Sequence, residues 1–133
     1  MATPAERWID AWFRAWSRHE PAALADCYAP GPVQRSEPFR ERIEPREYAA
    51  WAFADETVAE VWFAEPAVLA ADAAACEWWA ISQDRAGVTA TLAGVSLLRF
   101  DFNGRVIDQR DYWSTRDGAH EPPPDWGPVA RHA

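Results

Sequence analysis

Residues 92–113 read LAGVSLLRFDFNGRVIDQRDYW, and no other stretch indicates the architecture as clearly. Asn103-Gly104 at its centre is a strong signal for a two-residue hairpin turn. Apolar and polar residues alternate on both sides of it, as in strands with one buried face. Pairing Phe102 with Arg105 then places Leu98 opposite Gln109, Ser96 opposite Asp111 and Gly94 opposite Trp113.

A second hairpin is predicted at the turn Asp84–Gly87. If Gln83 pairs with Val88, Glu77 faces Gly94 and shares one sheet face with Trp79, Ser96, Asp111 and Trp113. The sequence then brings two carboxylates, Glu77 and Asp111, together on the face that helices would cover. Buried carboxylates are rare unless they are paired or functional. A slip of one residue at this turn would move Glu77 to the opposite face.

The N-terminal part of the chain has helical spacing. Thr3-Pro4-Ala5-Glu6 predicts a capping box at the start of a helix that ends near His19. We expect a shorter helix from Glu20 to Tyr28 and a third from Pro45 to about Asp55. Strands are expected at 33–36, 57–63, 74–83, 88–102 and 105–113. This order predicts an α+β fold with helices on one face of a curved antiparallel sheet.

Length and composition limit the possible classes of protein. The 133 residues suit one domain, expected over 1–113, followed by a polar, Pro-rich tail over 114–133 that is partly ordered. All 13 basic residues are arginines, which excludes Schiff-base chemistry and the P-loop lysine. The net charge of −8 argues against nucleic acid and anionic membranes as partners.

Cys27 and Cys76 are expected to be free thiols, because no signal peptide or metal-ligand spacing accompanies them. We predict no metal and no organic cofactor. The N-terminus has no apolar signal core, and no apolar run approaches the roughly 18 residues of a membrane span. The sequence therefore predicts a cytoplasmic protein.

Several motifs together resemble one known family. They are Tyr28-Ala29-Pro30, Ser36-Glu37-Pro38-Phe39-Arg40, Glu77-Trp78-Trp79-Ala80, Leu92-Ala93-Gly94-Val95-Ser96 and the run from Leu98 to Trp113. In order and spacing they resemble the SnoaL-like group of the nuclear transport factor 2-like superfamily, over roughly residues 5–128. The resemblance implies a cone: a strongly bent antiparallel sheet, with three N-terminal helices packed on its concave face around an apolar pocket.

The resemblance also implies roles for individual residues. Asp111 is similar to the aspartate base of the cyclases, and Glu37 is similar to the base of the steroid isomerases. The two oxyanion donors of the isomerases fall on Trp12 and Ser96, which are a different pair of residue types. The family contains enzymes and non-catalytic binding proteins, so the fold alone does not give a function.

The sequence therefore predicts a pocket protein for a small apolar or aromatic molecule. One hypothesis is a cofactor-free cyclase, isomerase or dehydratase-like enzyme, with Asp111 and Glu77 as catalytic carboxylates. The alternative is a non-catalytic small-molecule-binding or dimerisation module, in which these carboxylates are structural. The predicted pocket residues are Trp12, Trp16, Glu37, Trp51, Trp79, Gly94, Ser96 and Trp113.

The other face of the predicted sheet suggests self-association. It carries the apolar residues Trp78, Val95, Leu97 and Tyr112, fringed by Arg99, Asp108 and Arg110. So large an apolar patch is unusual on the surface of a small monomer. We therefore expect a homodimer formed through this outer sheet face.

Overall fold

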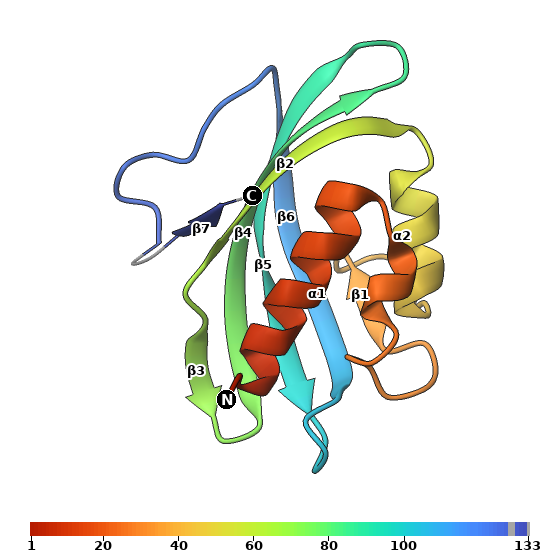
Figure 1. Cartoon of the computed structure of the whole chain (residues 1–133), viewed down its shortest axis with the longest axis vertical. Helices are drawn as coiled ribbons and strands as arrows, with labels where there is room; N and C mark the ends of the chain where they lie inside the picture. The colour runs from red at the N-terminus through yellow and green to blue at the C-terminus, as the bar shows by residue number, and fades with distance from the viewer. Residues whose placement is uncertain (128–129, 133) are drawn as a thin grey trace.

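The computed structural model describes residues 1–127 and 130–132. One sheet and the helices on its concave side make up the chain (Figure 1). The elements are α1 (Pro4–Arg18), the 3-10 helix η1 (Pro21–Leu24), β1 (Gln34–Ser36), α2 (Pro45–Phe53), β2 (Glu56–Ala64), β3 (Ala67–Ala70), β4 (Ala73–Asp84), β5 (Thr89–Phe100), β6 (Val106–Asp117) and β7 (Ala130–His132). The predicted α+β class is confirmed.

The sheet has the strand order β1-β6-β5-β4-β2-β7, with β3 paired to β4. All described pairings are antiparallel except that of β1 with β6. The long strands β2, β4, β5 and β6 curve around α1, and α2 lies beside α1 near the start of β2 (Figure 1). The inner face of the sheet and the two helices therefore enclose the core.

The first helix begins as the sequence predicts. The Thr3 hydroxyl accepts a hydrogen bond from the Glu6 backbone at 3.1 Å, and the Glu6 carboxylate accepts one from the Thr3 backbone at 3.0 Å. The helix ends at His19, which has a φ of 53° and caps the last carbonyls with its backbone N–H. Trp8, Ile9 and Trp12 on its inner side are almost fully buried.

The second predicted helix is wrong in length, because only η1 forms. Beyond it, the backbone of Cys27 accepts from Val106 at 2.8 Å, and the backbone of Ala29 donates to Val106 at 3.0 Å. These hydrogen bonds tie the segment to β6, so its peptide groups are not available to continue a helix. Both cysteines are free; Cys76 is buried and Cys27 is half-buried.

The register of β5 with β6 is the one the sequence predicts around the candidate site. Ser96 lies opposite Asp111, and Gly94 lies opposite Trp113. The turn itself is wider than predicted, because the Asp101 carboxylate accepts from the backbone of Asn103 and Arg105, at 2.8 and 2.9 Å. A β-bulge next to Phe100 restores the predicted register further along the strands.

The predicted register of β4 with β5 is wrong by one residue. The Asp84 carboxylate accepts from the backbone of Ala86 and Val88, both at 2.9 Å, so that Gln83 pairs with Thr89 instead of Val88. No bulge corrects this shift. Glu77 therefore lies opposite Val95 on the outer face, where it is exposed to solvent.

The segment after β6 returns along the outer face of the sheet (Figure 1). The Trp79 indole donates to the backbone carbonyl of His120 at 2.7 Å, and the Trp79 and Trp126 rings meet edge to face at 6.0 Å. The Thr91 hydroxyl donates to the backbone carbonyl of Gly118 at 2.7 Å. These contacts hold the C-terminal segment against β4 and β5, and β6 itself ends at Asp117 instead of Trp113.

Candidate functional site

A cavity of about 490 Å³ lies between the two helices and the inner face of the sheet. Six of the nine tryptophans line it: Trp8, Trp12, Trp16, Trp51, Trp78 and Trp113. Flat indole rings form walls that suit a flat, apolar molecule. Polar side chains gather at two places on these walls, around Asp111 and around Glu56.

Asp111 is 5 % exposed and accepts three hydrogen bonds from side chains. Its Oδ1 accepts from the Ser96 hydroxyl at 2.7 Å and from the Gln109 amide at 2.9 Å. Its Oδ2 accepts from the Gln34 amide at 2.9 Å. Ser96 in turn accepts from the Trp78 indole at 3.0 Å. The carboxyl group is therefore held in one position by donors from β1, β5 and β6.

Burial raises the pKa of Asp111, because a charged carboxylate loses the solvation it has in water. The hydrogen bonds from Gln34, Ser96 and Gln109, together with the nearby Ser36 hydroxyl, act in the opposite direction and do not fully offset burial. Gln34 Oε1, beside this carboxyl group, is buried and accepts no hydrogen bond.

A second chain of hydrogen bonds runs from Asp111 toward α1. Gln109 Oε1 accepts from the Tyr28 hydroxyl and from the Trp8 indole, the latter at 3.0 Å. The Trp12 indole donates to the Tyr28 oxygen at 2.6 Å. Burial raises the pKa of Tyr28 well above its ordinary value, so this phenol stays protonated and acts as a donor.

Tyr48 and Ser36 form a third polar group close to Asp111. The Ser36 hydroxyl donates to the Tyr48 oxygen at 2.9 Å and accepts from the Trp113 indole at 3.2 Å. Burial raises the pKa of Tyr48, and the negative charge of Asp111 raises it further. A neutral Tyr48 hydroxyl on the cavity wall is a donor for an oxygen atom of a ligand.

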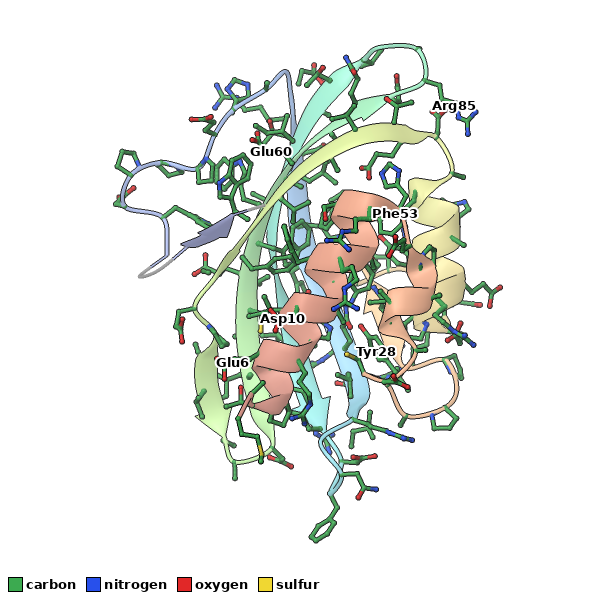
Figure 2. All side chains as sticks on the ribbon, in the orientation of Figure 1. Glu6, Asp10, Tyr28, Phe53, Glu60 and Arg85 are labelled. Carbon is green, nitrogen blue, oxygen red and sulfur yellow. The ribbon has the colours of Figure 1, made fainter. Side chains whose placement is uncertain are left out.

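Glu56 is the second carboxylate on the cavity wall. Its Oε2 accepts from the Ser82 hydroxyl at 2.7 Å and from the Trp16 indole at 3.3 Å. Its Oε1 lies 2.9 Å from His19 Nε2. The His19 ring stacks on Phe53 at 5.5 Å. Figure 2 shows Phe53 near the C-terminal end of α1.

Arg40 also lines the cavity. Its guanidinium carbon lies 5.1 Å from the centre of the Trp51 ring and 6.0 Å from that of Trp113. Its Nε forms an ion pair of 2.9 Å with Glu37, whose φ of 80° is in the left-handed region. The Glu37 backbone donates to the backbone carbonyl of Asp111 at 3.0 Å, which ties this loop to β6.

Comparison with solved structures identifies the fold. An NTF2-like protein of unknown function from Exiguobacterium sp. 255-15 has a TM-score of 0.67 at 14% identity, over 84% of this chain and 98% of that chain. The Δ5-3-ketosteroid isomerase of Mycobacterium sp. has a TM-score of 0.66 at 15% identity, over 85% and 95%. RV0760c of Mycobacterium tuberculosis, solved with estradiol-17β-hemisuccinate, has a TM-score of 0.67 at 20% identity, over 86% and 99%.

The chain has an NTF2-like fold. The SnoaL-like assignment predicted from the sequence is consistent with these matches. No protein-family model matches the sequence, and a search of curated proteins found no match. The sequence identities are low, so the matches establish the NTF2-like fold and leave the chemistry to be argued from this site.

Within the NTF2-like cavity, the structure brings together part of the predicted site. Of the predicted residues, those on the cavity wall are Trp12, Trp16, Trp51, Ser96, Asp111 and Trp113. Glu77 is not among them, because the register shift places it on the outer face. Trp79 follows Glu77 to that face, where it contacts the C-terminal segment.

Glu37 and Gly94 lie next to the cavity without lining it. Glu37 points its carboxylate at Arg40. A Cβ on Gly94 would lie 2.3 Å from the Tyr112 carbonyl and 2.6 Å from the Trp113 Cβ. Gly94 therefore allows β5 and β6 to approach closely.

The polar and aromatic cavity residues that sequence reasoning missed include Gln34, Tyr48, Glu56 and Trp78. Trp78 was placed on the outer face by the same register error that misplaced Glu77. For Tyr48, the sequence offers only its position within the predicted third helix. For Glu56, the available signal was its position between the predicted third helix and the strand that follows.

No group of three His, Cys, Asp or Glu side chains suited to a metal is found in residues 1–127 and 130–132. Over the same residues, no helix is long and apolar enough to cross a membrane. The Asp111 and Glu56 groups lie on the same cavity and are satisfied by neutral donors and by His19. The arrangement suits hydrogen bonding and proton exchange with a bound organic molecule.

Proposed function

We propose that this protein binds a small, flat, largely apolar molecule that carries a carbonyl or hydroxyl oxygen next to Asp111. The observation that carries the proposal is a buried carboxyl group of raised pKa on the wall of a tryptophan-lined cavity. The cavity volume of about 490 Å³ falls within the range that holds small organic ligands. The Tyr48 hydroxyl and a protonated Asp111 would both donate to the ligand oxygen.

Steroids are the ligand class to test first. Solved proteins of similar fold include a complex with estradiol-17β-hemisuccinate, a designed 17-OHP binder and a Δ5-3-ketosteroid isomerase. A steroid has the flat apolar body and the terminal oxygens that this cavity would accommodate. Because the sequence identities to these proteins are only 15–20%, their ligands do not carry over to this chain. A smaller aromatic ketone or phenol would fit the same apolar walls and the same donors.

Tryptophan fluorescence provides a direct binding assay, because six of the nine tryptophans line the cavity. Titration with 17-OHP should change the emission in a saturable way. Tyr48→Phe removes a donor to the ligand oxygen and should weaken binding, whereas Glu77→Gln, on the outer face, should not. If no steroid, aromatic ketone or phenol gives saturable binding, the proposal is wrong.

The second candidate function is cofactor-free proton transfer by Asp111. It is favoured by the raised pKa, because a carboxylate of higher pKa is a stronger base toward a carbon acid. A bound Δ5-3-ketosteroid incubated with the protein in D₂O would take up deuterium next to its carbonyl group. Asp111→Asn should slow this exchange by about two to four powers of ten. Saturable binding without exchange would instead indicate the non-catalytic alternative.

We further propose that two copies associate through the outer face of β5 and β6. With Trp78 turned inward, the large apolar residues of this face are Val95, Leu97 and Tyr112, and Tyr112 is 40 % exposed. Leu97→Asp should shift the protein to a monomer in sedimentation velocity at micromolar concentrations. A wild-type chain that sediments only as a monomer would contradict this proposal. The cytoplasmic location stays a prediction from the sequence.

A further inference from the structure

Arg40 differs from the other charged groups on the cavity wall. Its guanidinium carbon lies 5.1 Å from the centre of the Trp51 ring and 6.0 Å from that of the Trp113 ring. Its side chain is 40 % exposed, so this part of the wall lies at the surface. Trp51 is 63 % exposed, which leaves a large apolar ring open to solvent beside a cation. The cavity wall therefore reaches the surface at Arg40, a cation that lies close to the Trp51 and Trp113 rings.

The hydrogen-bonding capacity of Arg40 is only partly used. A guanidinium group has five N–H donors, and its two terminal nitrogens form a fork that matches a carboxylate. The ion pair with Glu37 uses Nε, at 2.9 Å. In residues 1–127 and 130–132, the structure shows no hydrogen bond from the terminal nitrogens of Arg40. The fork is therefore available to a ligand.

The acidic groups on the same wall are already compensated. Asp111 accepts hydrogen bonds from three side chains, and Glu56 contacts His19, Trp16 and Ser82. Asp55 faces Arg85 at 3.8 Å. Arg40 is the single arginine among the described residues that line the cavity. An anion that enters the cavity thus finds its complementary charge at this edge and not at Asp111.

We propose that Arg40 is a recognition site for an anionic group, a carboxylate or sulfonate, attached to the apolar ligand that fills the cavity. The inference rests on the proposed function, because the ring body of the ligand must occupy the tryptophan-lined space. The charged group lies at the opening, where it stays partly hydrated while Arg40 donates to it. The chain connecting the anion to the rings covers the exposed face of Trp51.

Two matched pairs of probes test this inference. Estradiol and estradiol-17β-hemisuccinate differ by an added carboxylate arm. Phenylnaphthylamine and anilinonaphthalene sulfonate differ by a sulfonate, and their binding does not depend on a steroid-shaped cavity. Dissociation constants would be measured by fluorescence for the wild type, Arg40→Gln, Glu37→Gln and Arg42→Gln.

Arg40→Gln should weaken binding of the anionic member of each pair by about tenfold, and that of the neutral member by less than about twofold. Glu37→Gln should tighten anion binding, because it frees Arg40 from a competing carboxylate. Arg42→Gln is the matched control: its side chain is also 40 % exposed, but it pairs with Asp108 and does not line the cavity. It should leave all four constants unchanged.

Three results would overturn the inference. Equal weakening of neutral and anionic members by Arg40→Gln would mean that Arg40 only holds Trp51 and Trp113 in place. Weakening of anions by Arg42→Gln as large as that by Arg40→Gln would indicate a net-charge effect. A wild-type protein that binds no member of either pair would refute the proposed function together with this inference. The first two results would refute only the role of Arg40 and leave the proposed function standing.

Discussion

Replacing Asp111 by asparagine separates the charge of this side chain from its shape. The new amide oxygen can accept from Ser96 and Gln109, as Oδ1 does now at 2.7 and 2.9 Å. The new amide nitrogen would face Gln34, whose Oε1 is buried and accepts no hydrogen bond. If the Gln34 amide turns over, its Oε1 accepts from the new amide nitrogen. Asp111→Asn should therefore preserve the packing of the cavity wall.

The expected magnitude follows from two opposing effects. A hydrogen bond to a charged acceptor contributes about 1.5–3 kcal/mol, against about 1 kcal/mol for a neutral one, so the carboxylate gains from its donors. Burying the charge costs several kcal/mol. The raised pKa of Asp111 shows that burial outweighs the hydrogen bonds. We expect Asp111→Asn to have a free energy of unfolding within about 1 kcal/mol of the wild type at neutral pH, or above it.

Asp111→Ala is the contrasting variant, because it removes the acceptor and leaves three buried donors without a partner. Each unsatisfied donor costs about 1–3 kcal/mol, so the total loss should be at least about 3 kcal/mol. Urea denaturation followed by circular dichroism would measure both variants. If Asp111→Asn loses as much stability as Asp111→Ala, the charge itself stabilises the fold and the argument from burial is refuted.

Three further predictions concern the same region. The free energy of unfolding of the wild type should fall as the pH rises from 3.8, the ordinary pKa of an aspartate, through the raised pKa of Asp111, because the folded state binds this proton more tightly. Asp111→Asn should remove this pH dependence, which urea unfolding at several pH values would measure. Gly94→Ala should destabilise the fold by about 1–3 kcal/mol, since its Cβ meets the Tyr112 carbonyl; an unchanged melting temperature would contradict this. Glu77→Gln should change stability by less than about 0.5 kcal/mol and leave ligand affinity unchanged in fluorescence titrations.

The two hairpins show how far the sequence determines the register. Asp84 and Asp101 begin the same pattern, Asp-x-x-Gly-x, and each carboxylate accepts from the backbone two and four residues later. Each turn therefore shifts the pairing by one residue from the simpler turn assumed from the sequence. After Asp101 a bulge reverses the shift, and Asp111 lies where it was predicted. After Asp84 nothing reverses it, and Glu77 moves outward.

Contacts between distant segments account for the rest of the site. Gln34 reaches Asp111 across 77 positions because β1 pairs with β6 in parallel, and a parallel pair has no connecting turn to signal it. Glu56 lies at the junction of α2 and β2, and its partners His19 and Ser82 come from α1 and β4. These partners meet only once the helices pack on the curved sheet, so periodicity along the chain cannot reveal them.

The tryptophan content and the buried acceptors of the cavity have one physical cause. An indole supplies a flat apolar face, but a buried indole also carries an N–H that needs an acceptor. The acceptors are distributed accordingly: Trp16 donates to Glu56, Trp78 to Ser96, Trp113 to Ser36, and Trp8 and Trp12 to Tyr28. A cavity walled by so many indoles must hold polar oxygens deep inside, and one of them, the Ser96 hydroxyl, also donates to Asp111. Glu77, which faces solvent, meets none of these donors, and the second carboxylate of the cavity is Glu56 instead.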